Sequence, residues 1–83
     1  MKTRKEIMQR INELSEGKED RGNNANYKIN RQVNILDWAV GKYESEVLDR
    51  IEYIKEQKKR VTTSQGRNLY NKEFSELLWV LDY

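Results

Sequence analysis

The chain has 83 residues, of which 36% are apolar and 36% charged, with a formal net charge of +2. This length predicts one domain near the lower limit for independent folding. The absence of Cys and His excludes disulfides, thiolate metal sites and imidazole as a general base or ligand. A nearly neutral charge does not predict a general nucleic-acid coat, and no apolar run approaches the ~18 residues of a membrane span. We expect a soluble, cytoplasmic, non-enzymatic protein without cofactor or metal and without a membrane partner.

A first helix is predicted to begin after Thr3. Thr3 followed by Glu6 forms a capping-box pattern, in which the hydroxyl and the carboxylate each accept a hydrogen bond from an early amide. The helical spacing i, i+4, i+7 then connects Ile7, Ile11 and Leu14. Gly17 predicts the end of this helix.

A loop over residues 17–24 is predicted to lead into a second helix. Gly22, Asn23 and Asn24 do not favour a helix, so we expect the loop to extend through them. The spacing i, i+4, i+7, i+11 then connects Ile29, Val33, Leu36 and Val40. Gly41 marks the end of the second helix and implies a short connection to the third.

The second half of the chain repeats this pattern. Val47, Ile51 and Ile54 predict a third helix that runs to about Arg60, and residues 61–66 are expected to interrupt it. A fourth helix is predicted to begin near residues 68–71 and to run nearly to Tyr83. Its apolar positions are Tyr70, Phe74, Leu77 and Leu81. No long segment shows the strict apolar–polar alternation of a half-buried strand.

An internal repeat relates the two halves. Residues 6–11 align with 46–51, and after a shift of one position residues 30–40 align with 71–81, so that both Trp residues coincide. We interpret this match as a duplication rather than as a chance similarity between amphipathic helices. The predicted fold is all-α, with αα-hairpin repeats at 3–41 and 43–83 forming a pseudo-twofold four-helix arrangement within one domain, 1–83. A thin apolar seam without disulfides or metal also predicts a homo-oligomer, most simply a dimer.

The connection between the third and fourth helices is a candidate phosphate-binding site. Cations and hydroxyls are concentrated there without an acidic residue, whereas the first loop is balanced in charge. Cations attract phosphate, and hydroxyls and loop amides donate hydrogen bonds to it. The alternative is that these cations only stabilise a helix C-terminus through its dipole. The candidate residues are Lys58, Lys59, Arg60, Thr62, Thr63, Ser64 and Arg67.

The aromatic residues suggest a second type of site. Trp38 and Trp79 occupy equivalent positions and are expected to seal the seam between the hairpins. Tyr53, Trp79 and Tyr83 are less well accounted for by the apolar stripes and are candidates for contact with a partner protein.

Arg10 and Arg50 are also equivalent, and each follows a Glu residue, Glu6 or Glu46, at the i+4 spacing. This spacing predicts ion pairs within each helix.

Residues 27–41, and their echo in 70–81, share a further pattern. It consists of Asn, five residues, Leu, any residue, Trp and two apolar residues. This pattern resembles the short "YN…ALEWVLG" closing helix of small helical-hairpin proteins encoded by bacteriophages and prophages. The resemblance implies an accessory protein, in a class that includes inhibitors of host enzymes and of bacterial defence, and it identifies no binding residues.

Three functions remain open at this point. The first is a phage or prophage accessory protein that binds a host or defence protein in the host cytoplasm. The second is a nucleotide- or nucleic-acid-binding module that uses residues 58–67. The third is a structural protein that acts only through oligomerisation.

Overall fold

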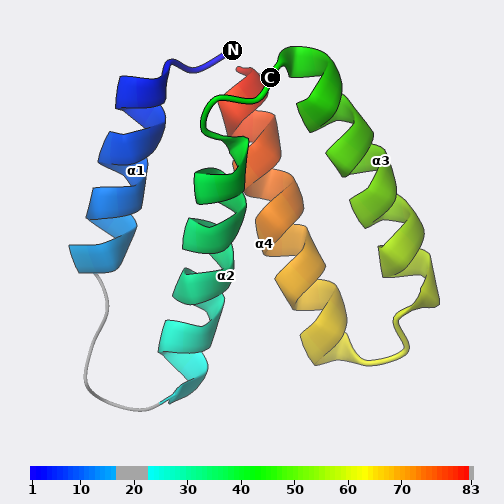
Figure 1. The fold of residues 1–83 in the computed structure, drawn as a ribbon. Coiled ribbons are helices and arrows are strands. Elements are labelled where there is room, and N and C mark those ends of the chain that lie inside the picture. Colours follow the sequence, from blue (N-terminus) through cyan, green and yellow to red (C-terminus); the bar gives the residue numbers. More distant parts are fainter. Residues whose placement is uncertain (17–22, 83) are drawn as a thin grey trace.

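The structure, a computed structural model, describes residues 1–16 and 23–82, apart from the side chains of residues 23–26. This part of the chain contains no strand and consists of four helices, α1 (Arg4–Glu16), α2 (Asn23–Ala39), α3 (Glu44–Arg60) and α4 (Ser64–Leu81). The predicted all-α, four-helix fold is therefore confirmed. Successive helices reverse direction, so α2 and α4 run the same way (Figure 1).

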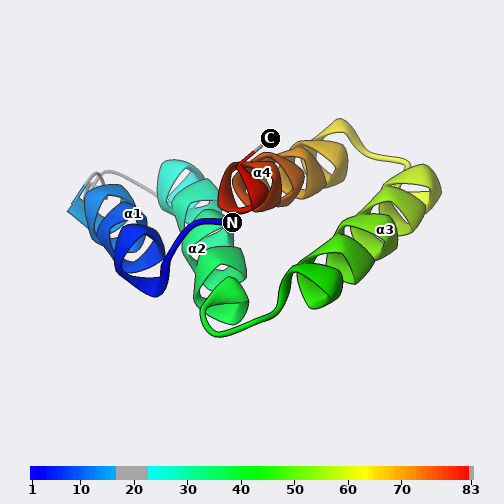
Figure 2. The same ribbon diagram turned by 90° about the horizontal axis from the view of Figure 1, so that it is seen from above.

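The helices form a flat array rather than a closed bundle. α1 packs on α2, α3 packs on α4, and the two hairpins meet where α2 packs on α4. Figure 2 shows α1 and α3 at the two ends of this array. The molecule accordingly measures 35 × 32 × 17 Å. The two central helices are contacted from both sides, and each outer helix packs mainly against one neighbour.

The first helices of the two hairpins begin with the same hydrogen bond, from the N-cap amide to the Glu carboxylate three residues later. The amide of Thr3 donates to Glu6 Oε1 at 3.2 Å, and the amide of Glu6 donates to the Thr3 hydroxyl at 3.2 Å. The predicted capping box is therefore present. At the equivalent position of the second hairpin, the amide of Tyr43 donates to Glu46 Oε1 at 3.3 Å.

The fourth helix begins earlier than the sequence pattern indicated. A start near residues 68–71 is wrong, because α4 begins at Ser64. Thr63 caps it, with its hydroxyl accepting a hydrogen bond from the amide of Gly66 at 3.1 Å. The predicted 17–24 loop is also too long, since α2 already begins at Asn23. Residues 17–22 lie outside the described part of the chain.

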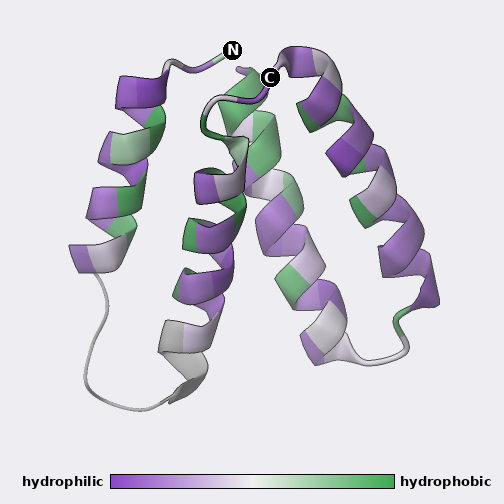
Figure 3. Cartoon of the chain, in the orientation of Figure 1, coloured by the Kyte–Doolittle hydropathy of each residue, from purple (hydrophilic) through white to green (hydrophobic). Residues whose placement is uncertain are grey.

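The core contains most of the predicted apolar stripes and a second set of residues, but Ile29 and Val33 of the second stripe are only partly buried and lie outside it. Leu36, Val47, Ile54 and Leu77 are all fully buried. Further buried residues lie on the central helices outside the stripes, namely Ile35, Ala39, Leu69 and Val80. They are buried because α2 and α4 each pack against two neighbours. Figure 3 shows the hydrophobic residues on the α2-facing side of α1 and along the C-terminal half of α4.

Contacts between residues near the two ends of the chain tie α1 to α4. The amide of Lys2 donates to the carbonyl of Val80 at 2.6 Å, and Lys2 Nζ lies 2.5 Å from Asp82 Oδ1. The hydrogen bond with the Lys2 ammonium lowers the pKa of Asp82, and the same bond raises the pKa of Lys2. Asp82 has a φ of 68° and closes the last turn of α4.

Candidate functional site

The residues predicted to bind phosphate are divided among three elements. Lys58, Lys59 and Arg60 form the last turn of α3, residues 61–63 form the connection, and Ser64 and Arg67 lie in α4. The position of the three cations suits the negative end of the α3 dipole. The hydroxyl of Thr63 is already used as the cap of α4.

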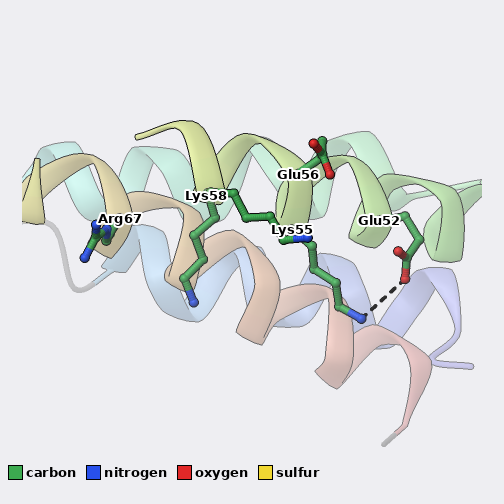
Figure 4. A pocket seen from close by; sticks show the side chains of 6 residues that line it. Glu52, Lys55, Glu56, Lys58 and Arg67 are labelled. Carbon is green, nitrogen blue, oxygen red and sulfur yellow. Dashed lines mark hydrogen bonds and ion pairs between the residues drawn. The ribbon is translucent and has the colours of Figure 1, made fainter. Parts of the chain in front are cut away.

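An open cavity of about 510 Å³ lies between the C-terminal part of α3 and the start of α4. It brings together three of the predicted cations with three residues of the preceding turns, and its lining consists of Glu52, Lys55, Glu56, Lys58, Lys59 and Arg67. Figure 4 shows Lys55 and Lys58 extending from α3, with Arg67 beyond them. We call this the basic cavity.

The remaining predicted residues do not line the basic cavity. The lining does not include Arg60, whose Nη2 lies 3.9 Å from Glu56 Oε1, and it includes none of Thr62, Thr63 and Ser64. Lys55, which the sequence reasoning did not single out, lies one helical turn before Lys58 and Lys59. The i, i+3, i+4 spacing of these three lysines was the signal that could have identified it.

The two Trp residues lie between the hairpins, as expected. The ring of Trp79 on α4 is covered by Lys2 Nζ at 5.3 Å and by the Arg10 guanidinium at 5.4 Å. Both cations belong to the first hairpin. Trp79 is therefore partly buried, as is the equivalent Trp38, and its role as a candidate for contact with a partner stays a prediction.

The same contacts recur with the hairpins exchanged. Lys42 Nζ lies 5.5 Å from the centre of the Trp38 ring, and the Arg50 guanidinium lies 5.6 Å from it. Each Trp of one hairpin thus meets the equivalent Arg of the other hairpin. This exchange is the pattern that a pseudo-twofold relation between two repeats would produce.

Of the other two aromatic candidates, Tyr53 lies on the surface and Tyr83 lies outside the described residues. Tyr53 is 49% exposed, and its ring lies 4.7 Å from the Arg50 guanidinium. Arg50 therefore connects Tyr53 on α3 with Trp38 on α2. We call these three side chains the aromatic row.

The first hairpin's Arg takes part in an ion pair in which the Glu side chain is buried and the Arg side chain is half-buried. Arg10 Nε donates to Glu76 Oε2 at 2.9 Å, and its Nη2 donates to Glu76 Oε1 at 2.6 Å. Gln32 Nε2 also donates to Glu76 Oε1, at 3.0 Å. The hydrogen bonds with Glu76 raise the pKa of Arg10. The predicted pairing of Arg10 with Glu6 is wrong, because Glu6 caps α1 and Arg10 reaches across to α4.

Glu73 and Glu76 are both buried, at 4% and 3% exposure, and the sequence reasoning missed them. They lie at i+4 and i+7 from Leu69, and Val80 lies at i+11, so all four residues share one face of α4. That spacing was the signal that could have revealed them. Arg31 Nε donates to Glu73 Oε1, while Glu73 Oε2 has no hydrogen-bond partner among the described residues.

In the described part of the chain, Arg50 forms no ion pair of the kind that Arg10 forms with Glu76. The position equivalent to Glu76 in the first repeat is Ile35, and Glu46, the predicted partner of Arg50, caps α3. The Nε atom of Arg50 is buried and has no hydrogen-bond partner among the described residues.

A cavity of about 240 Å³ lies beside Arg50, between α2, α3 and α4. It is lined by Arg31, Asn34, Ile35, Trp38, Arg50 and Glu73. We call this the Arg50 cavity. Both residues whose buried atoms lack a hydrogen-bond partner among the described residues, Arg50 and Glu73, line this cavity.

Within residues 1–16 and 23–82, no cluster of three or more Asp or Glu side chains could hold a metal ion. None of the four described helices is long and apolar enough to cross a membrane. No known family matches the chain, and neither the curated proteins nor the solved structures give a match.

Proposed function

We propose that this chain is a non-enzymatic binding protein that acts by occupying a host protein or an anti-phage defence protein. The observation that carries this proposal is the aromatic row of Tyr53, Arg50 and Trp38 across α3 and α2. Tyr, Trp and Arg are the residue types that dominate binding hot spots. The resemblance of the closing helices to phage and prophage accessory proteins supports a target in the bacterial host.

The two rings beside Arg50 also reduce the conformational entropy that a partner would have to remove on binding. Arg50 is held between Tyr53 at 4.7 Å and Trp38 at 5.6 Å. A partner would therefore meet side chains that have already lost part of their conformational freedom, and ordering an interface side chain otherwise costs about 0.5–1.5 kcal/mol.

Affinity purification from a phage-infected or expressing bacterial host tests this proposal. The tagged native chain should retain a stoichiometric protein partner, and Tyr53→Ala should reduce its recovery at least tenfold. Tyr43→Ala is the matched control, because Tyr43 is 76% exposed and lies at the N-cap of the same helix. Equal recovery with native protein and Tyr53→Ala would contradict the proposal.

A second candidate function is the binding of a nucleotide or nucleic acid in the basic cavity. The observation that favours it is the convergence of Lys55, Lys58, Lys59 and Arg67 on one open cavity of about 510 Å³. Two carboxylates, of Glu52 and Glu56, offset part of this charge, and Glu52 pairs with Lys55 at 3.3 Å. For this reason we rank the basic cavity below the aromatic row.

Calorimetric titration with ATP tests the second candidate. Binding should weaken steeply between 50 and 200 mM salt, because cation–phosphate contacts release counterions. The triple variant Lys58→Gln, Lys59→Gln, Arg67→Gln should abolish it. Lys72→Gln, which removes an exposed cation outside the cavity, is the control. Binding that is unchanged in the triple variant, or absent from the native chain, would exclude ATP as a ligand of this site.

A third possibility, assembly without another partner, predicts only a homo-oligomer. The exposed apolar side chains Met8 and Leu48 occupy equivalent positions of α1 and α3, at 41% and 39% exposure. They could contribute to contact between copies, and sedimentation measures that property directly.

A further inference from the structure

We propose that the Arg50 cavity binds a carboxylate side chain, Asp or Glu, of a protein partner in the way that Arg10 binds Glu76 within the chain. That the carboxylate comes from a protein partner rests on the proposed function. The site itself rests on a comparison of the two halves of the molecule.

The first half shows what an Arg in this setting binds. Arg10 lies 5.4 Å from the centre of the Trp79 ring and donates two hydrogen bonds to Glu76. Glu76 stands three residues before Trp79 on α4, which places its carboxylate one helical turn from the indole. The result is a bidentate Arg–carboxylate pair, the strong form of this interaction, beside an aromatic ring.

The second half has the same Arg and Trp, but Ile35 stands where the first half has Glu76, and its acid, Glu73, stands where the first half has Gln32. Arg50 lies 5.6 Å from the Trp38 ring, nearly the distance found for Arg10 and Trp79. The residue three positions before Trp38 is Ile35, which cannot accept a hydrogen bond. Arg50 Nε is buried, and no described residue accepts a hydrogen bond from it. A buried donor without an acceptor is unfavourable, and more so when it is charged, so an acceptor from a partner would bind favourably there.

The remaining lining residues favour an anion that also carries a hydrogen-bond donor. Arg31 and Arg50 outnumber the one acid, Glu73, so the cavity has an excess of positive charge. Glu73 is only 4% exposed, and its Oε2 has no partner among the described residues, although Arg31 pairs with its other oxygen. An acidic residue in a peptide provides both groups, a carboxylate for Arg50 and an amide N–H for Glu73.

The size and position of the cavity suit a protruding side chain. Its volume of about 240 Å³ is several times the ~30 Å³ share of one water molecule. α4 lies between α2 and α3 and contributes Glu73 (Figure 2). Two of the lining residues, Trp38 and Arg50, belong to the aromatic row, so a partner bound to that row would stand over the cavity.

A titration of the isotope-labelled chain with N-acetyl-glutamate methylamide tests the site without the natural partner. The Nε–H signal of Arg50 and the indole N–H signal of Trp38 should shift and saturate. The signals of Arg10 and Trp79 should stay in place, because Glu76 already occupies their site. N-acetyl-glutamine methylamide, the neutral analogue, should cause no shift. Arg50 signals that do not move, or that move equally with both compounds, would overturn the proposal.

Two variants make the result specific. Ile35→Glu introduces an acid at the position equivalent to Glu76 and should abolish the response of Arg50 and Trp38 to the probe. Arg50→Gln should abolish the response of Trp38, and it keeps the test decisive if Ile35→Glu does not fold. A Trp38 response that persists in Arg50→Gln would show that the carboxylate binds elsewhere.

The outcomes also separate this inference from the proposed function. Probe binding at Arg50, combined with full partner recovery by Tyr53→Ala, would leave the carboxylate site standing and remove the aromatic row as the partner surface. Loss of the partner with Tyr53→Ala, combined with no probe binding, would leave the aromatic row as the partner surface and remove the carboxylate site.

Discussion

The environments of Arg10 and Arg50 differ mainly in one residue, and that difference has energetic consequences. Glu76 is 3% exposed and can remain charged there because Arg10 and Gln32 both donate to it. Removing Arg10 would leave a buried carboxylate with only one neutral donor. Removing Arg50 would not deprive a buried carboxylate of its paired cation, because the position equivalent to Glu76 is Ile35 and the buried Glu73 is paired with Arg31.

We therefore expect Arg10→Gln to destabilise the fold by about 1.5–3 kcal/mol, the range for a hydrogen bond to a charged group. Arg50→Gln should cost less than about 1 kcal/mol. Urea denaturation of both variants at pH 7 measures the difference. Equal losses of stability would mean that Arg50 is paired within the chain, through Glu73, and would argue against the carboxylate site.

The ion pair between Lys2 and Asp82 makes a prediction about pH. The hydrogen bond with Lys2 lowers the pKa of Asp82 in the folded chain. The Asp82 carboxylate therefore stabilises the fold fully at pH values above its unfolded-state pKa, about 3.9. This stabilisation is lost as the pH falls through the lower pKa of Asp82 in the folded chain. An NMR titration of the Asp82 carboxyl carbon should show this lowered midpoint, and Lys2→Gln should move it upward. A midpoint unaffected by Lys2→Gln would show that the pair does not persist in solution.

The ion pairs of Glu73 and Glu76 were not predicted from the sequence because both side chains are buried. Charged residues usually occupy solvated helix faces, so the i, i+4 spacing of Glu6 and Arg10 favoured a local pair. The pairing with Glu76 depends on α4 packing near α1, which no local pattern encodes. The same limit applies to the Arg50 cavity, because its lining comes from three helices.

At the scale of elements, helical periodicity was sufficient for all four helices and for most of their ends. α1 begins at its capping box, and α3 ends at Arg60 as expected. The start of α4 was predicted too late because Ser64 and Gly66 have low helix propensity in a helix interior. In the first turn they are favourable, since Thr63 caps the helix through the amide of Gly66.

Gly66 supplies a test of this helix start. Replacing a helical Gly by Ala usually stabilises a helix by about 1 kcal/mol. Here a Cβ atom would lie 2.6 Å from Val61 Cγ1 and 3.0 Å from Thr63 Oγ1. We expect Gly66→Ala to destabilise the native chain, and to be less harmful by about 1 kcal/mol when Val61→Ala is also present. A double-mutant cycle by thermal denaturation measures this coupling. A full gain in stability from Gly66→Ala alone would show that α4 does not begin as described.

At the scale of the whole molecule, the flat array leaves more surface than a compact monomer of this mass. The accessible surface is 5835 Å², whereas a typical 10 kDa monomer exposes about 5,200 Å². The radius of gyration is 12.9 Å, against about 11.8 Å for a compact chain of this length. The dimer stays a prediction, and this extra exposed surface is the physical reason to expect it. Sedimentation at tens of micromolar should show it, and a monomer at that concentration would refute it.

The shared core should make the two halves interdependent. Leu36 and Leu77 are equivalent and both fully buried. Each Leu→Ala variant should lose about 2–5 kcal/mol, the usual cost of truncating a core Leu. Leu48→Ala, at a position 39% exposed, is the control and should change stability much less. Circular dichroism should show a single transition in each variant, and two separate transitions would mean that the hairpins unfold independently.

The short connection between α2 and α3 has a further consequence for assembly. Gly41, with a φ of +79°, turns the chain back after Ala39, and α3 begins at Glu44. If this turn straightened, α2 and α3 would join into one long helix, and each hairpin could pack against the other hairpin of a second copy. Such a domain-swapped dimer would keep every Arg–Trp contact and the Arg10–Glu76 pair while moving them between chains. A β-branched residue such as Val at position 41, which disfavours positive φ, should shift the chain toward that exchanged form.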